Sequence, residues 1–484
     1  MNIAQKIKKE FHVGSQLNDY LKIKKGFLYY KDIKLMSLVE QYATPLEVAY
    51  TDIISERIKS LQKIFKDAIK TNKYPGKYLY AYATKANYYS EVVSTALNDI
   101  DSLETTSAYD LEIIDHLLKR GLIDKSLLII CNGFKHGNYF DKIIALKKKG
   151  LNILPVLENT DEVELFLNET NLPFTIGMRL NIDEEVVAGF ENGERLGAEV
   201  DTRFGMSLKE MQESAKKINQ ADHLTLKLLH FHLGGTIKNT KQFIEFTGRL
   251  FEQNYCVLKK QCPDLEYFDF GGGLPAQYSL DFHFDYKDFA NRLVKKILTI
   301  SKKQSVAPPT LVGEHGRYTV NDHGFSIFKI DLVKAAKQGN TFWYLINSSL
   351  MNFLPDSWAL GQNFIILPLN GWDRPFVKTR LGGITCDPDD TYYKSEKDNF
   401  LYMPSISEGE DLYVGIFGTG AYQDMISGVG GVHHCLLPEG NELIIYKKNH
   451  KLFFDKITRL QPPEQVLKIL DYHRHHRLTR YKNK

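Results

Sequence analysis

The stretch Tyr78-Leu79-Tyr80-Ala81-Tyr82-Ala83-Thr84-Lys85-Ala86-Asn87 decides the fold, because it joins a short apolar run to a polar tip that carries a lysine. Seven similar runs follow it, and each ends in a polar or glycine-rich tip. The eight runs are Tyr78 to Ala83, Ser102 to Thr105, Leu127 to Cys131, Asn152 to Leu157, Phe174 to Leu180, Leu226 to Phe231, Tyr267 to Phe270 and Thr310 to Val312. They are too short for helices and lack strict alternation, which is typical of strands buried on both faces.

Amphipathic stretches with helical spacing of apolar residues lie between these runs. Examples are Leu111 to Arg120, Asp141 to Lys149, Ser207 to Ile218 and Phe243 to Gln261. Strand and helix alternating eight times predict an α/β fold, a closed parallel (β/α)8 barrel of the TIM type. In such barrels the catalytic groups gather at the carboxyl ends of the strands. Here those ends carry Lys85, Glu104, Asn132, Arg179, His232, Gly271 to Gly273 and Glu314.

A β-rich second domain is expected after Arg317, where strand-like runs are separated by turns. The runs are Phe325 to Val333, Thr341 to Ile346, Gln362 to Pro368, Phe376 to Leu381, Leu412 to Ile416 and Leu443 to Tyr446. Before the barrel, Lys22 to Tyr30 predicts a short strand pair and Lys34 to Ala49 a connector. We therefore expect a barrel over 48–320 and a β-rich domain formed by 1–47 and 321–484.

Composition sets bounds on partners and location. The chain has 484 residues, 43% of them hydrophobic, and a net charge of +3, so no global field favours nucleic acid or an anionic membrane. Its five cysteines lack the paired spacing of a zinc site or a disulfide framework. No run approaches the length of a membrane span, and the N-terminus has no apolar signal region. We expect a cytoplasmic protein without a metal, and a solvated basic tail at His473 to Arg477.

Six motifs in order carry a family resemblance. They are Tyr82-Ala83-Thr84-Lys85-Ala86-Asn87, His230-Phe231-His232-Leu233-Gly234, Gly271-Gly272-Gly273, Glu314-His315-Gly316-Arg317, Thr385-Cys386-Asp387 and Gly420-Ala421-Tyr422. The set resembles the fold-type III decarboxylases that depend on pyridoxal 5'-phosphate, which are built from a barrel and a β domain. The segments Leu354 to Trp358, Ile384 to Asp389 and Gly420 to Gln423 are most similar to those of arginine decarboxylases.

Lys85 is the predicted attachment point of the cofactor. A lysine amine forms a Schiff base with an aldehyde, and a rigid strand end is a suitable place for it. The resemblance implies that Glu104 orients this amine. For the cofactor phosphate, the glycines Gly271, Gly272 and Gly273 let backbone N–H groups approach an anion closely. Arg317 would add a permanent charge there, and Tyr422 resembles the family tyrosine that donates a hydroxyl hydrogen bond to the phosphate.

Glu314 is expected to face the pyridine nitrogen and keep it protonated, which makes the ring an electron sink. Alanine racemases with the same barrel have an arginine there, so a glutamate favours decarboxylation. His232 resembles the imidazole that stacks on the ring, and Arg179 is expected to reach the cofactor or His232.

Cys386 occupies the family position of the acid that protonates the substrate carbon after decarboxylation, and a thiol suits that step. The resemblance implies that its loop enters the active site of a second subunit, giving a homodimer with shared sites. A guanidinium group binds a planar carboxylate well. The expected substrate-binding residues are Asp356, Cys386, Asp387 and Asp389, with Asp390 as a further candidate carboxylate.

The predicted function is conversion of the small-molecule substrate L-arginine to agmatine and carbon dioxide for polyamine synthesis, by a carbon–carbon lyase. Two alternatives remain open at this point. One is decarboxylation of another long amino acid such as diaminopimelate, lysine, ornithine or a carboxylated polyamine. The other is a regulatory homologue without catalysis, which would typically have lost the lysine, the phosphate site or the acid.

Overall fold

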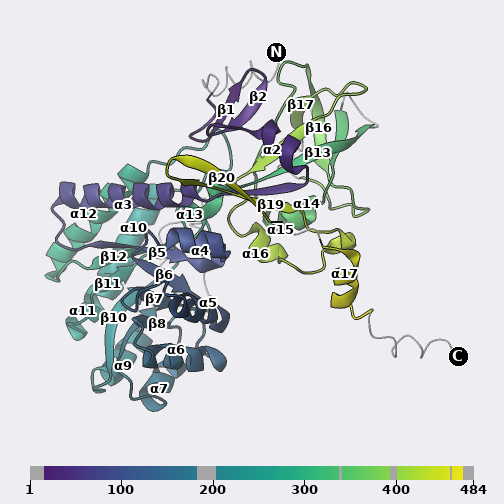
Figure 1. The fold of residues 1–484 in the computed structure, drawn as a ribbon. Helices are drawn as coiled ribbons and strands as arrows, with labels where there is room; N and C mark the ends of the chain where they lie inside the picture. Colours follow the sequence, from purple (N-terminus) through teal and green to yellow (C-terminus); the bar gives the residue numbers. More distant parts are fainter. Residues whose placement is uncertain (1–15, 183–202, 337–340, 393–399, 458–460, 473–484) are drawn as a thin grey trace, which may run out of the picture. The chain divides into compact units, whose positions relative to one another are not determined.

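A computed structural model describes residues 16–182, 203–336, 341–392, 400–457 and 461–472 (Figure 1). The chain divides into two compact units. The barrel unit comprises Ile54–Pro275 and Phe284–Thr319, and the β unit comprises Met1–Ile53, Ala276–His283 and Val320–Lys484. None of the helices in the described ranges is long and apolar enough to cross a membrane. The predicted N-terminal and histidine-rich C-terminal segments lie outside the described residues.

The barrel unit contains eight parallel strands that close in the order β10-β11-β12-β5-β6-β7-β8-β9. They are β5 (Tyr78–Ala83), β6 (Ser102–Thr105), β7 (Leu128–Cys131), β8 (Ile153–Leu157), β9 (Phe174–Arg179), β10 (Leu224–His230), β11 (Tyr267–Asp269) and β12 (Thr310–His315). The predicted barrel is confirmed. Strand β12 runs three residues further than expected, so Glu314 lies within the strand and not after it.

Apolar side chains fill the inside of the barrel. Ala81, Ile130, Leu154, Val156, Leu228 and Val312 form one buried cluster. All five residues of β8 are buried, as expected for a strand that has the barrel interior on one face and helices on the other. This packed interior gives the strand ends a rigid support.

Helices follow the strands in alternation. They are α3 (Asp52–Asn72), α4 (Ser90–Ala96), α5 (Ala108–Lys119), α6 (Asn138–Lys148), α7 (Thr160–Asn168), α9 (Leu208–Ile218), α10 (Thr240–Leu250), α11 (Cys256–Gln261), α12 (Tyr286–Gln304) and α13 (Arg317–Val320). The single helix expected over Phe243 to Gln261 is wrong in detail, because a π-helical turn at Phe251–Tyr255 separates α10 from α11.

The β unit contains a mixed sheet with the strand path β17-β16-β14-β13-β4-β19-β20, to which β18 and β15 are added. These strands are β4 (Leu46–Tyr50), β13 (Gly324–Ala335), β14 (Thr341–Ile346), β15 (Ile365–Pro368), β16 (Phe376–Gly382), β17 (Leu401–Pro404), β18 (Tyr413–Phe417), β19 (Asn441–Lys448) and β20 (Lys451–Ile457). A separate three-stranded sheet contains β1 (Leu21–Lys24), β2 (Phe27–Tyr30) and β3 (Ile33–Lys34).

The connector predicted over Lys34 to Ala49 is wrong, because this segment contains helix α2 (Leu35–Tyr42) and most of strand β4. β4 lies in the middle of the sheet, antiparallel to β13 and parallel to β19. Both partner strands are hundreds of residues away in sequence, so the local sequence pattern does not predict this strand. The short helices α14 (Leu350–Phe353), α15 (Pro355–Leu360) and α16 (Gln423–Ser427) were also not expected, and helix α17 (Pro463–Ile469) lies near the end of the described residues.

Candidate active site

Lys85 and Glu104 form the first contact of the candidate site. Lys85 lies in a short 3₁₀ turn (Thr84–Ala86) directly after β5, and its Nζ is 3.3 Å from the carboxylate of Glu104 on the next strand, β6. The Glu104 side chain is fully buried, whereas the lysine side chain is 43% exposed. An ion pair between a buried acid and an accessible amine therefore stands at the mouth of the barrel.

Asn132, which follows β7, joins two buried carboxylates. Its Nδ2 donates to Glu104 Oε1 at 2.9 Å and to Glu314 Oε1 at 2.7 Å. One amide thus connects strands β6 and β12 across the mouth of the barrel. The sequence placed Asn132 at a strand end but assigned it no role, since an asparagine at a strand end is also an ordinary turn residue.

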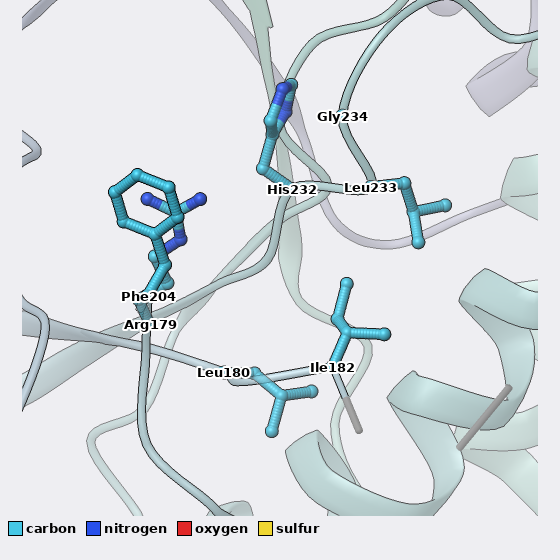
Figure 2. Close-up of a pocket in the computed structure, with 7 residues that line it drawn as sticks. All are labelled: Arg179, Leu180, Ile182, Phe204, His232, Leu233 and Gly234. Atoms are coloured by element: carbon cyan, nitrogen blue, oxygen red, sulfur yellow. The ribbon is translucent and has the colours of Figure 1, made fainter. Parts of the chain in front are cut away.

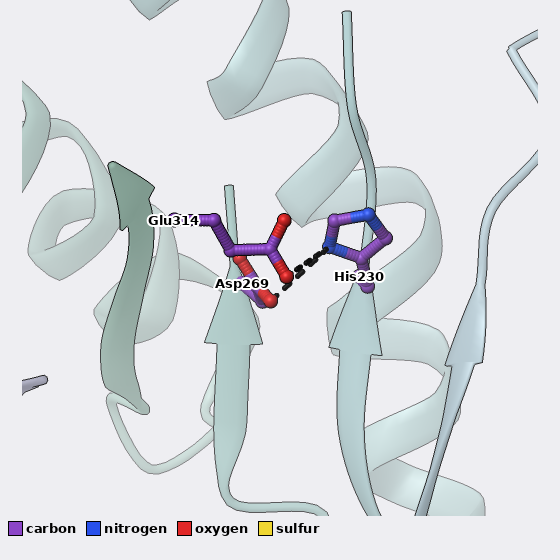
Figure 3. A group of neighbouring side chains, drawn as sticks. All are labelled: His230, Asp269 and Glu314. Atoms are coloured by element: carbon purple, nitrogen blue, oxygen red, sulfur yellow. Dashed lines mark ion pairs between the residues drawn. The ribbon is translucent and has the colours of Figure 1, made fainter. Parts of the chain in front are cut away.

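Glu314 has two further neighbours, His230 and Asp269, at the ends of adjacent strands (Figure 3). His230 Nδ1 lies 3.1 Å from Asp269 Oδ2 and 3.8 Å from Glu314 Oε1. Burial raises the pKa of Glu314 to about 8, with a contribution from Asp269, and burial also raises the pKa of Asp269 to about 7. Burial lowers the pKa of His230. The two acids therefore hold protons in a range where an exposed carboxyl has lost its own.

Within the described residues, these three side chains also have a spacing that suits metal ligands, because their ligand atoms lie within 4.8 Å of one another. The sequence named Glu314 and did not name Asp269 or assign His230 a role. Asp269 is the last residue of β11, two positions before the glycine triplet. This position at a strand end was the signal from which the sequence could have predicted it as a site residue.

His232 follows β10, two residues after His230, and is half-buried. Burial, followed by the nearby charge of Lys85, lowers its pKa well below the usual value, so the imidazole is neutral at physiological pH. Its Nδ1 accepts a hydrogen bond from the Gly272 N–H at 3.3 Å. A neutral, oriented ring is the form that can stack on a flat aromatic group.

The glycine triplet packs backbone against backbone. A Cβ at Gly271 would lie 2.7 Å from the Phe231 carbonyl oxygen, and one at Gly272 would lie 2.6 Å from the Glu314 carbonyl oxygen. Gly273 has a φ of +92°, and a Cβ there would lie 3.4 Å from the carbonyl oxygen of Gly235. Glycine is thus required for close approach at the first two positions and for the backbone conformation at the third.

The same loops fit a phosphate group. Gly235 has a φ of +52° and open space where a Cβ would be. The N–H groups of Gly271 and Gly272 already donate to Asp269 and His232, whereas that of Gly273 has no acceptor in the described part of the chain. Consecutive backbone N–H groups beside left-handed glycines form the concave surfaces that bind anions.

A pocket beside His232 encloses about 70 Å³ (Figure 2). Arg179 stacks on Phe204, with its guanidinium carbon 4.3 Å from the ring centroid, and its Nη1 pairs with Glu158 at 3.0 Å. The residues that line the pocket are Arg179, Leu180, Ile182, Phe204, His232, Leu233 and Gly234. Arg179 and His232 thus border one pocket. Arg317 begins α13, directly after β12.

The remaining predicted site residues lie in the β unit. Cys386 is exposed in the loop after β16. Buried Asp390 holds this loop, because its carboxylate accepts hydrogen bonds from the Thr385 hydroxyl at 2.7 Å and the Ser349 hydroxyl at 3.0 Å. Asp390 therefore has a structural role in holding the loop, whereas Asp389 is exposed.

Asp387 and Asp356 each have a partner inside the β unit. Asp387 pairs with His434 at 3.0 Å, and buried Asp356 accepts a hydrogen bond from Gln423 Nε2 at 3.0 Å. Tyr422, next to Gln423, is half-buried and has a φ of +70°.

Comparison with known proteins agrees with this arrangement. Residues 55–321 match the family described as pyridoxal-dependent decarboxylase, pyridoxal binding domain. The biosynthetic arginine decarboxylase of Geobacter sp. (strain M21) is 24% identical, over 91% of this chain and 85% of that protein. The chloroplastic arginine decarboxylase 1B of Nicotiana tabacum is 24% identical, over 81% of this chain and 66% of that protein.

Two solved structures show a similar fold. The biosynthetic arginine decarboxylase of Campylobacter jejuni has a TM-score of 0.81 and 20% identity, covering 100% of this chain and 95% of that chain. The diaminopimelate decarboxylase of M. jannaschii has a TM-score of 0.73 and 19% identity, covering 93% of this chain and 100% of that chain. Since the family match spans more than half of the sequence, this chain belongs to the pyridoxal-dependent decarboxylases, whose cofactor is pyridoxal phosphate.

Proposed function

We propose that this protein converts L-arginine to agmatine and carbon dioxide. The observation that carries the reaction type is the set of Lys85, Glu104, Asn132 and Glu314, joined by contacts of 2.7 to 3.3 Å at the carboxyl ends of the barrel strands. The choice of arginine is supported by relatives in bacteria and a plant that are named arginine decarboxylases.

Each barrel residue has a distinct task in this proposal. Lys85 would hold the cofactor through Nζ, with Glu104 orienting that nitrogen. The glycine triplet and Arg317, together with Tyr422, would hold the phosphate, and neutral His232 would support the ring. When bound, pyridoxal phosphate accepts the electron pair released as carbon dioxide leaves. Arg179 supports the pocket next to His232.

Glu314 controls the proton at the ring nitrogen. Its carboxyl group is buried and has a raised pKa, so it can share a proton with a basic nitrogen without leaving an unpaired buried charge. His230 and Asp269 stand behind it and hold that proton within the same set. Asn132 fixes the position of the Glu314 oxygen.

Cys386 is the proposed acid that places a proton on the carbon from which carbon dioxide has left. In this proposal its loop acts in the site of a second copy, and the protein is a homodimer with shared active sites. Exposure of the Cys386 thiol supports such a role. Asp356, Asp387 and Asp389 are the proposed carboxylates for the guanidinium group, and Asp389 is the exposed one.

The product would enter polyamine synthesis, and we place the enzyme in the cytoplasm. Five free cysteines support a reducing compartment, where disulfides seldom persist. The likeness to diaminopimelate decarboxylases is the observation in favour of a second candidate substrate. Lys85, the glycine triplet and Cys386 are all present, whereas a regulatory homologue without catalysis would typically have lost one of them.

The test is release of carbon dioxide from arginine, ornithine, lysine and diaminopimelate, each at saturating pyridoxal phosphate. We expect arginine to give the highest kcat/KM. Turnover of diaminopimelate with inert arginine would overturn the proposed substrate, and no turnover of any amino acid would overturn the activity.

A further inference from the structure

Two exposed cysteines of the β unit lie in neighbouring segments. Cys386 lies in the loop after β16, and Cys435 lies in a short helical turn (His434–Leu436). Desolvation, and then the neighbouring Cys386 thiol, raise the pKa of the Cys435 thiol. The other three cysteines, Cys131, Cys256 and Cys262, are buried. Among the five cysteines, these two are thus both accessible to solvent and near each other.

Neighbouring side chains hold the two segments together independently of the thiols. Asp387 Oδ2 is 3.0 Å from His434 Nε2, so the residue after Cys386 is paired with the residue before Cys435. The His434 carbonyl oxygen also accepts a hydrogen bond from Asn352 Nδ2 at 3.2 Å. These contacts place Cys435 beside the loop that Asp390 anchors.

The backbone at Cys435 is unusual for a residue with a side chain. Cys435 has a φ of +59° and Leu436 a φ of +53°, both in the left-handed region that favours glycine. Such conformations persist where the surrounding structure imposes them, and they gather at functional positions. Here the strained residue is Cys435, which follows the His434 that pairs with Asp387.

We propose that Cys386 and Cys435 are a modification site, at which a peroxide converts the two thiols into a reversible disulfide within one subunit. One thiolate attacks a peroxide oxygen and becomes a sulfenic acid. The second thiol then attacks that sulfur and displaces water. Two thiols and one hydrogen peroxide thereby give one disulfide and two waters, and a dithiol reductant reverses the change.

The effect on catalysis rests on the proposed function. While the disulfide exists, Cys386 has no thiol proton to give, so decarboxylation stops. Cys435 has no part in the proposed reaction and serves only as the resolving thiol. Oxidation would therefore switch the enzyme off and also protect Cys386 from irreversible oxidation to a sulfinic acid.

The experiment treats the holoenzyme with hydrogen peroxide, then maps its peptides by mass spectrometry without reduction. Agmatine production is measured in parallel, before and after dithiothreitol. We expect a linked peptide containing Cys386 and Cys435, and a loss of activity of at least about 100-fold, the usual contribution of a general acid, which dithiothreitol restores.

Two variants make the result specific. Cys435→Ser should keep its basal activity but form no linked peptide, and its Cys386 should proceed to sulfinic acid that dithiothreitol cannot restore. Cys262→Ser is a control that keeps both exposed cysteines, and it should respond to peroxide as the protein without substitutions does. Two results with the unsubstituted protein would overturn the proposal. One is sulfinic acid at Cys386 with no linked peptide, and the other is a disulfide between two chains.

Failure of the proposed function gives a different result. A linked peptide that forms while agmatine production stays constant supports the modification site and overturns the acid role of Cys386. The mass measurement decides the disulfide even for a chain with no turnover.

Discussion

Lys85 combines an accessible amine with a fully buried carboxylate partner at the carboxyl end of a barrel strand. Replacing it by alanine removes the covalent attachment of the cofactor. We expect Lys85→Ala to show no borohydride-stable pyridoxal phosphate by mass spectrometry and less than about one-hundredth of the activity. The matched control is Lys119→Ala, which removes an exposed lysine paired with Asp115. Equal labelling of both variants would contradict the assignment of Lys85.

Asn132 is the residue that the structure adds to the site. Asn132→Ala removes hydrogen bonds to two buried carboxylates, and bonds to charged groups contribute about 1.5 to 3 kcal/mol each. We expect kcat/KM to fall by about 10- to 100-fold, which corresponds to the loss of about one such bond. Asn132→Asp should be worse, because it places a third acid beside Glu104 and Glu314. An alanine variant with unchanged kcat/KM would show that the bridge has no part in catalysis.

Asp269 and Glu314 make the cofactor-free protein sensitive to pH. Their pKa values in the folded state, about 7 and about 8, are above those of ordinary carboxyl groups because of burial. Between pH 4 and these values, the folded state binds more protons than the unfolded state. The free energy of unfolding therefore decreases as the pH rises through this window, and the contribution of these groups is fully present only below it.

Urea unfolding of the cofactor-free protein at pH 6 and pH 9 tests this dependence. We expect lower stability at pH 9, and a smaller difference in Asp269→Asn, which cannot ionise at that position. A variant that keeps the whole pH difference would mean that Asp269 is not responsible for it.

At the scale of elements, the glycine loop after β11 is proposed to bind the cofactor phosphate, and Gly273 is the position in it that can be tested. Gly273→Ala places a Cβ 3.4 Å from the Gly235 carbonyl oxygen at a φ of +92°. Beyond a backbone cost of about 1 kcal/mol, we expect weaker binding of pyridoxal phosphate, because the Gly273 N–H would shift. The measurement is a fluorescence titration with the cofactor.

Gly121→Ala is the matched control for that loop. Gly121 has a φ of +67° and open space around its Cβ position, so it carries the backbone cost without touching the site. The two variants should unfold at similar urea concentrations, and only Gly273→Ala should lose cofactor affinity. Equal affinities of the two variants for pyridoxal phosphate would show that this loop does not bind the phosphate.

At the scale of the whole molecule, the proposed sharing of sites between two subunits can be tested by mixing. Lys85→Ala and Cys386→Ala are each expected to be inactive. If the sites are shared, a mixed dimer has one intact site of two, so equal amounts that exchange subunits should regain about a quarter of the original activity. Ultracentrifugation of the unmodified protein should show a dimer. A dimer that regains no activity on mixing would mean that each chain supplies both residues of its own site.

The sequence by itself determined the barrel and most of its site. Eight apolar runs became eight strands within a few residues of their predicted bounds, because burial on both faces leaves a continuous local signal. The polar tips Lys85, Glu104, Asn132 and Glu314 lie together because all strands of a parallel barrel end on one side. Membership of the decarboxylase family was likewise evident from the order of six motifs.

Only the tertiary structure decided the pairings between distant segments. Strand β4 escaped prediction because its partners β13 and β19 are far away in sequence. The grouping of His230, Asp269 and Glu314 and the proximity of the segments that carry Cys386 and Cys435 were not predicted for the same reason. A residue's neighbours in the chain fix its local conformation, but its pKa and its partners depend on which other strands and loops the fold brings within a few ångströms.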